Sequence, residues 1–191
     1  HKKNYPKAAH TQLIIPYCLL VHGVRNKKFR PLQVLVTTKL LFGSSFLESH
    51  ISLISKVMGV HQKTVIVHLK TLVNDNLMGY DAIESRYFCR GWNYLRILLR
   101  DDSTVGYRIS LDQIKKFKAF AIAATYDQLI ASQQSKRWRA KRERLKKGTS
   151  RQIAYGTNGY YPVANAAYAK IFKVSEATAS RYRSLAAEAG W

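Results

Sequence analysis

The stretch that decides the fold covers residues 49–77 and reads SHISLISKVMGVHQKTVIVHLKTLVNDNL. Apolar residues recur at helical spacing in both halves of it, at Ile51, Ile54 and Met58 and again at Val65, Leu69 and Leu72. Gly59 separates the halves, and Asn74-Asp75-Asn76 ends the second one. We therefore predict two short helices, at 49–58 and 62–73, with a tight turn between them and their apolar faces turned inward.

The flanking residues predict one helix before this pair and strands after it. Pro31 suits the first turn of a helix, which we expect to run to Phe42 and to end at Gly43. Residues 77–111 contain many strand-forming residues, among them four Tyr and three Ile, and two turn signals, so we predict a β-hairpin or a three-stranded wing behind the helices. Asp112 is a plausible N-cap for a long helix that runs towards Lys147 or breaks near residues 132–135.

The last 27 residues repeat the first pattern. We predict a helix at 166–172, a turn at 173–175 in which Ser175 is the N-cap, and a second helix at 176–189. Two short helices joined by such a turn form a helix-turn-helix unit. The predicted fold is mainly α with a small β wing, and its parts are a basic N-terminal segment at 1–30, a winged helix-turn-helix at 31–111, a long basic helix at 112–147, a linker at 148–162 and a C-terminal helix-turn-helix at 163–191.

The charge balance points to a polyanionic partner. Lys and Arg number 32 against 11 Asp and Glu, which gives a formal net charge of +21. A field of that strength favours binding to phosphate backbones, and a pI near 10.2 is the electrostatic footprint expected of a nucleic-acid binder. The alternative is an unusually basic surface that only water contacts.

Enzymatic function is not expected. The chain has no phosphate-binding G-x-x-x-x-G-K-[ST] loop, no Cys-x-x-Cys pair and no cluster of carboxylates, so we predict no catalytic residue, no metal and no cofactor. Cys18 and Cys89 lie in apolar surroundings and are expected to be reduced core residues. No apolar run reaches the length of a membrane span, so we expect no membrane partner and a cytoplasmic, nucleoid-associated location.

These patterns resemble the winged helix-turn-helix domain of bacterial and archaeal regulators. The residues that carry the resemblance are GVHQKTV at 59–65, HLKTL at 68–72 and Asn76-Leu77. The run KVSEATASRYR at 173–183 is similar, but Lys173 stands where the turn glycine usually lies. That position often has a positive φ, which costs lysine about 1 kcal/mol, so a different turn conformation at Lys173 is a second expectation. Two such units in tandem also resemble the replication initiators of plasmids and phages.

The resemblance implies that the second helix of each unit enters the major groove of DNA, with its N-terminal residues meeting base edges. The candidate nucleic-acid-binding residues are Gln62, Lys63, Thr64, Lys70 and Thr71 in the first unit; Arg86 near the wing tip; Lys136, Arg137, Arg139, Lys141, Arg142 and Arg144 in the basic stretch; and Ser175, Thr178, Ser180, Arg181 and Arg183 in the second unit. Gln62 suits adenine, Lys63 suits guanine or phosphate, the Thr64 methyl group suits thymine, and Arg181 suits guanine.

Several alternatives stay open at this point. Ile66 and Val67 make the outward face of the first unit rather apolar, so this unit is alternatively a packing surface for a second copy of the chain. The basic stretch either follows a phosphate backbone or is a solvated charged helix. The leading function is sequence-specific binding of duplex DNA, as a transcriptional regulator or as a replication initiator of a mobile element. The other class is a protein that binds or packages DNA or RNA without sequence preference.

Overall fold

The computed structural model describes residues 11–100, 104–146 and 163–190. Most of them are helical, and two small antiparallel sheets complete the fold. In chain order the elements are β1 (Gln12–Pro16), α1 (Tyr17–Asn26), α2 (Phe29–Phe42), β2 (Ser45–Leu47), the 3₁₀ helix η1 (Glu48–His50), α3 (Ile51–Met58), α4 (Gln62–Asn74), β3 (Met78–Asp81), β4 (Arg86–Cys89), α5 (Trp92–Leu98), β5 (Gly106–Ser110), the 3₁₀ helix η2 (Asp112–Lys116), α6 (Phe117–Lys146), α7 (Asn165–Phe172) and α8 (Glu176–Glu188).

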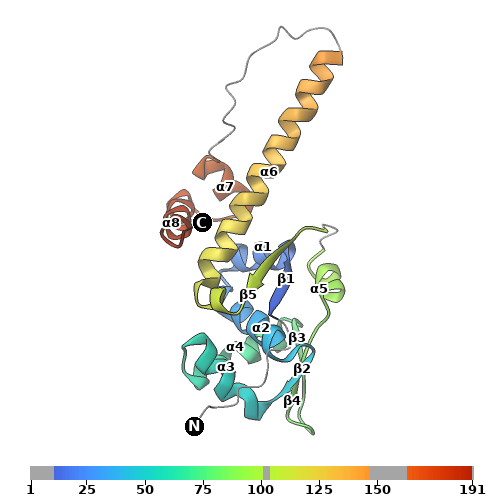
Figure 1. Ribbon diagram of the computed structural model, residues 1–191, viewed down its shortest axis with the longest axis vertical. Coiled ribbons are helices and arrows are strands. Elements are labelled where there is room, and N and C mark those ends of the chain that lie inside the picture. Colours follow the sequence, from blue (N-terminus) through green and yellow to red (C-terminus); the bar gives the residue numbers. More distant parts are fainter. Residues whose placement is uncertain (1–10, 101–103, 147–162, 191) are drawn as a thin grey trace.

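Helix α2 lies at the centre of the molecule. Its residues from Pro31 to Leu41 are all buried, as is typical of a helix that is surrounded on every side. It contacts α1, α3, α4 and α6 as well as strands β1, β2 and β4 (Figure 1). The helix begins at Phe29, two residues before the predicted start, and ends at Phe42 as expected.

The predicted helix pair at 49–73 is present as α3 and α4. The six residues predicted to face inward, Ile51, Ile54, Met58, Val65, Leu69 and Leu72, are all buried. The C-terminal pair is present as α7 and α8, within one residue of its predicted bounds. Helical periodicity therefore located both pairs correctly.

The strand prediction for residues 77–111 is correct only for its first part. Strands β3 and β4 form the expected hairpin, but their sheet has the order β2-β4-β3, so its third strand is residues 45–47, where we expected only a break. Residues 92–98 form helix α5 and not a strand. Leu95 is fully buried while Ile97 is 78% exposed, whereas residues two apart in a strand would lie on the same face. Strand β5 instead pairs with β1 in a separate two-stranded sheet.

Helix α6 is long and contacts α1, α2 and α8. Its 30 residues extend about 45 Å, and Figure 1 shows its far end projecting beyond α7, away from the rest of the molecule. Apolar residues at helical spacing are buried, at Ile114 in η2 and at Phe117, Ala121, Ala124 and Leu129 in α6. Asp112 does not cap this helix, because it is the first residue of η2, which precedes α6 and has Leu111 at its N-cap position.

The C-terminal helix pair is packed onto the rest of the chain. The rings of Tyr126 in α6 and Tyr168 in α7 are stacked with centroids 3.9 Å apart. Tyr182 in α8 meets Phe29 of α2 edge to face at 5.8 Å. Arg25 Nη2, at the end of α1, donates to the carbonyl oxygen of Ile171 at 3.1 Å. These contacts place both helix pairs in one packed body, and the predicted linker at 148–162 lies outside the described residues.

Candidate nucleic-acid interface

The two helix pairs share the same turn. Gly59 and Lys173, which end α3 and α7, both have left-handed backbone conformations, with φ of 66° and 54°. In each pair the following valine donates its N–H to a carbonyl near the end of the first helix, from Val60 to Ser55 and from Val174 to Ala169, both at 3.0 Å. The turn at Lys173 therefore keeps the geometry of the glycine turn, and the different turn that the sequence left open does not occur.

Both second helices also begin in the same way. His61 Nδ1 accepts a hydrogen bond from the Lys63 N–H at 3.1 Å, and Ser175 Oγ accepts one from the Thr178 N–H at 3.2 Å. Ser175 is thus the N-cap of α8, as predicted. Free N–H groups at the start of a helix and the helix dipole favour an anion such as a phosphate. In α4 the Thr64 N–H is already bonded to the His61 carbonyl oxygen at 3.0 Å, and in α8 the acidic Glu176 of the first turn opposes an anion.

The outward face of α4 is open. Gln62, Lys63, Thr64 and Lys70 are exposed, and neither lysine forms an ion pair with any residue that the structure describes. Thr71 is half-buried, and its hydroxyl donates to the Val67 carbonyl oxygen at 3.0 Å. The helix thus presents its amino-terminal turn and two cations to solvent, while the hydroxyl of Thr71 is engaged with its own helix.

The outward face of α8 is open as well. Ala179, Tyr182 and Ala186 are buried against the body of the molecule. Ser180, Arg181 and Arg183 are exposed and Thr178 is half-buried. Residues two apart on a helix do not share a face, so Arg181 and Arg183 point to different sides of α8. Arg181 lies on the same side as Thr178, which is three residues nearer the amino-terminal end.

The tip of the β3–β4 hairpin is acidic. Arg86 is half-buried, and its Nε lies 3.0 Å from Glu84 Oε2. Asp81 Oδ1 accepts from the N–H groups of Ile83 and Glu84, at 2.8 and 3.3 Å. A phosphate that approached Arg86 would therefore meet two carboxylates, which opposes the contact expected from the sequence.

The basic stretch of the sequence lies in the projecting end of α6. Lys136, Arg137, Arg139, Lys141, Arg142 and Arg144 fall within the helix, and their side chains lie outside the described residues, as does that of Trp138.

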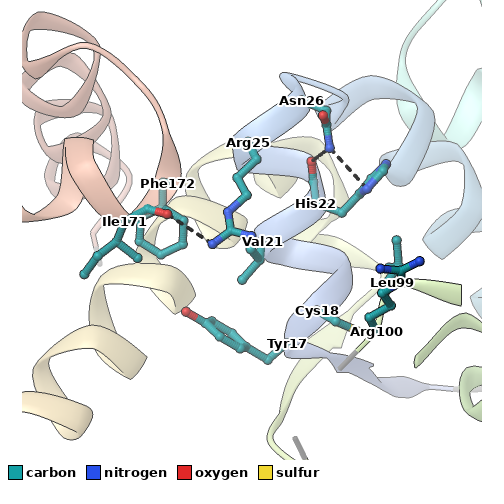
Figure 2. A pocket seen from close by; sticks show the side chains of 10 residues that line it. All are labelled: Tyr17, Cys18, Val21, His22, Arg25, Asn26, Leu99, Arg100, Ile171 and Phe172. Carbon is teal, nitrogen blue, oxygen red and sulfur yellow. Dashed lines mark hydrogen bonds between the residues drawn. The ribbon is translucent and has the colours of Figure 1, made fainter. Parts of the chain in front are cut away.

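A cavity that the sequence did not suggest lies where α7 meets α1 (Figure 2). It has a volume of about 400 Å³, and its lining includes Tyr17, His22, Arg25, Arg100 and Phe172. In Figure 2, Arg25 reaches across it from α1 to the end of α7, where it holds the Ile171 carbonyl. Burial lowers the pKa of His22, and the nearby Lys28 lowers it further. None of the lining residues comes from α4 or α8, so the cavity is separate from the two outward faces.

No known family matches the chain. Searches of curated proteins and of solved structures also gave no match. The case for function therefore depends on the residues and their geometry alone.

The described part of the chain holds no group of three or more His, Cys, Asp or Glu residues placed to bind a metal ion. Its helices include none that is both long and apolar enough to cross a membrane. Cys18 and Cys89 are both buried thiols and do not form a disulfide. Burial raises the pKa of Cys89, so its thiol stays protonated at neutral pH.

Proposed function

We propose that this chain binds duplex DNA sequence-specifically by placing the outward faces of α4 and α8 in major grooves. In this proposal residues 29–89 form a winged helix-turn-helix, because α2, the α3–α4 pair and the β3–β4 hairpin follow one another in the predicted order of helix, helix pair and wing. Residues 163–190 form a second helix-turn-helix unit without a described wing.

The observation that carries the proposal is the repeated presentation, after the same capped turn, of an exposed helix face with at least one basic side chain. A major groove about 12 Å wide admits an α-helix, and the first turn of that helix meets base edges and phosphates. Both α4 and α8 offer such a turn, together with Lys63 and Lys70 in one unit and Arg181 in the other. The net charge of +21 supplies the attraction to phosphates that such a complex requires.

Two biological roles fit this binding mode, a transcriptional regulator and a replication initiator of a mobile element. They differ in the arrangement of their sites on DNA. Repeated copies of one site beside a replication origin support the initiator, and a single palindrome over a promoter supports the regulator. Mapping the bound sites on the DNA that carries the gene distinguishes the two.

The test of the proposal is selection of bound fragments from random duplexes, followed by measurement of affinity with the Arg181→Ala variant. Arg181 suits a bidentate contact to guanine, so we expect its loss to cost about 1–3 kcal/mol at one base position and to relax the preference there. The matched control is Arg108→Ala, which removes the same charge from an exposed position on β5. We expect the control to keep the full base preference.

An unchanged base preference in the Arg181→Ala variant would show that α8 does not read bases. Equal displacement of bound duplex by any DNA or RNA, with one steep dependence on salt, would instead support the second candidate, binding without sequence preference. The observation that favours this second candidate is the basic end of α6, which projects from the body (Figure 1). Neutralising Lys141 and Arg142 is expected to weaken binding to all sequences alike.

A further inference from the structure

Val67 is an exposed apolar side chain in the middle of the outward face of α4. It is 59% exposed, whereas Val65, two residues earlier, is fully buried. Valine is a weaker helix former than alanine, lysine or glutamine, so the helix itself gives no reason for it at this position. The residue contributes nothing to the core, which raises the question of what it contacts.

The neighbours of Val67 on the helix surface are polar. Residues three and four positions away share its face, and these are Lys63, Thr64, Lys70 and Thr71. Lys63, Thr64 and Lys70 are exposed. An apolar protein surface laid over Val67 would therefore take two ammonium groups out of water, which is costly unless each finds a partner.

A DNA major groove suits both kinds of side chain at once. Its walls offer phosphates to the lysines, and its floor carries one apolar group, the C5-methyl of thymine. In α4 one lysine lies on each side of Val67 along the helix axis, Lys63 before it and Lys70 after it, so both lysines can face phosphates while Val67 faces the floor of the groove.

The second helix pair shows that this position is used differently there. Because the turns of the two pairs match, residues at the same distance from the turn are equivalent, which pairs Val65 with Ala179 and Val67 with Arg181. Val65 and Ala179 are both fully buried, and Val67 and Arg181 are both exposed. One position thus carries an apolar side chain in the first unit and a guanidinium in the second.

We propose that Val67 determines specificity by packing against the methyl group of a thymine in the major groove. The inference rests on the proposed duplex binding and adds the base that α4 reads. It also implies that the two units read different bases, a thymine through Val67 and a guanine through Arg181.

The test replaces each thymine of the selected duplex in turn with deoxyuridine, which removes only the C5-methyl group. We expect one thymine, or two adjacent ones, at which this change weakens binding by the unmodified chain roughly three- to five-fold, the value of about one buried methyl group. In the Val67→Ser variant, which has no methyl group to offer, the same deoxyuridine is expected to change affinity less than about 1.5-fold, since the contact that it removes is already lost.

The competing reader is Thr64, a candidate binding residue on the same face that also carries a methyl group, and Thr64→Ser removes that methyl group while keeping the hydroxyl. If Val67 reads the thymine, Thr64→Ser changes the affinity for the thymine duplex and for the deoxyuridine duplex by the same factor. If Thr64→Ser abolishes the response and Val67→Ser keeps it, Thr64 reads the methyl group and the assignment to Val67 is wrong. Unchanged thermal unfolding of both variants verifies that neither substitution alters the fold.

The remaining outcomes separate this inference from the proposed function. If no duplex is preferred over random DNA, the proposed function itself fails. If a preferred duplex exists but deoxyuridine has no effect at any thymine, only the role of Val67 fails. If Val67→Ser leaves the deoxyuridine pattern unchanged and lowers the mass measured by light scattering, Val67 contacts a second copy of the chain and the inference is overturned.

Discussion

Thr125 and Tyr168 offer a sharp test of how the C-terminal helix pair is held on α6. Both side chains are fully buried, and Thr125 Oγ1 lies 2.8 Å from Tyr168 Oη. The Thr125 hydroxyl also donates to the Ile122 carbonyl oxygen at 2.7 Å. Because that bond uses its single proton, the Tyr168 hydroxyl must be the donor between the two side chains.

This assignment makes the two single substitutions unequal. Thr125→Val keeps the shape of the side chain but leaves the Tyr168 hydroxyl as a buried donor without an acceptor, which costs about 1–3 kcal/mol. Tyr168→Phe removes the donor while Thr125 keeps its bond to Ile122, so only one ordinary hydrogen bond is lost, about 0.5–1.5 kcal/mol. In the double variant both partners are apolar and no group is left unsatisfied. We therefore expect the double variant to be more stable than Thr125→Val alone.

The measurement is the free energy of unfolding from urea titrations of the parent, both single variants and the double variant. The control is Thr37→Val, because Thr37 is equally buried but its hydroxyl donates only to Gln33 within its own helix, at 2.7 Å. We expect this control to be less destabilised than Thr125→Val. The assignment is refuted if the double variant is at least as unstable as Thr125→Val, or if Thr37→Val costs as much.

Two further predictions concern the turns and the dependence of stability on pH. Gly59→Ala should lower the free energy of unfolding by about 1–2 kcal/mol, because φ is positive there. An added Cβ would meet no atom within 4 Å, so the backbone conformation alone accounts for this cost. Lys173→Gly should raise the free energy of unfolding, and urea titrations that gave the same sign for both variants would contradict this. Burial, and next the charge of Lys28, lower the pKa of His22, so the unfolded chain takes up a proton first as pH falls below about 6.5. The free energy of unfolding should then be lower at pH 5 than at pH 7.5, and an equal decrease in the His22→Gln variant would exclude His22 as a cause.

The helix pairs could be predicted from the sequence, whereas the strand partners could not. Apolar residues at helical spacing are a local signal, and they located α3, α4, α7 and α8 to within about two residues of their observed bounds. The pairing of β1 with β5 joins Leu13 to Ile109 across most of the described chain. Strand-forming residue types give no information about such a partner, because strand preference depends on the surrounding sheet.

The sequence predicted which residues lie on the candidate interface, but it did not predict which of their polar atoms are free to contact a ligand. Lys63, Lys70 and Arg181 are exposed on the faces where helical spacing places them. The hydroxyl of Thr71 is taken up by its own helix, and Arg86 is next to Glu84. These local partners depend on rotamers and on turn geometry, which residue type and spacing do not specify.

The packing of the C-terminal helix pair against α2 bears on the form of the DNA site. Phe29 and Tyr182 hold the start of α2 against α8, and Lys118 Nζ lies 5.6 Å from the centre of each ring. Under the proposed function, one chain then presents two unlike readers whose separation is fixed by the fold. A palindrome needs two copies of the chain related by two-fold symmetry, since its halves are identical. A single copy instead matches an asymmetric site with unlike halves at constant spacing. The unlike residues at the positions of Val67 and Arg181 therefore predict an asymmetric site for one copy of the chain, and a palindromic selected site would indicate two copies.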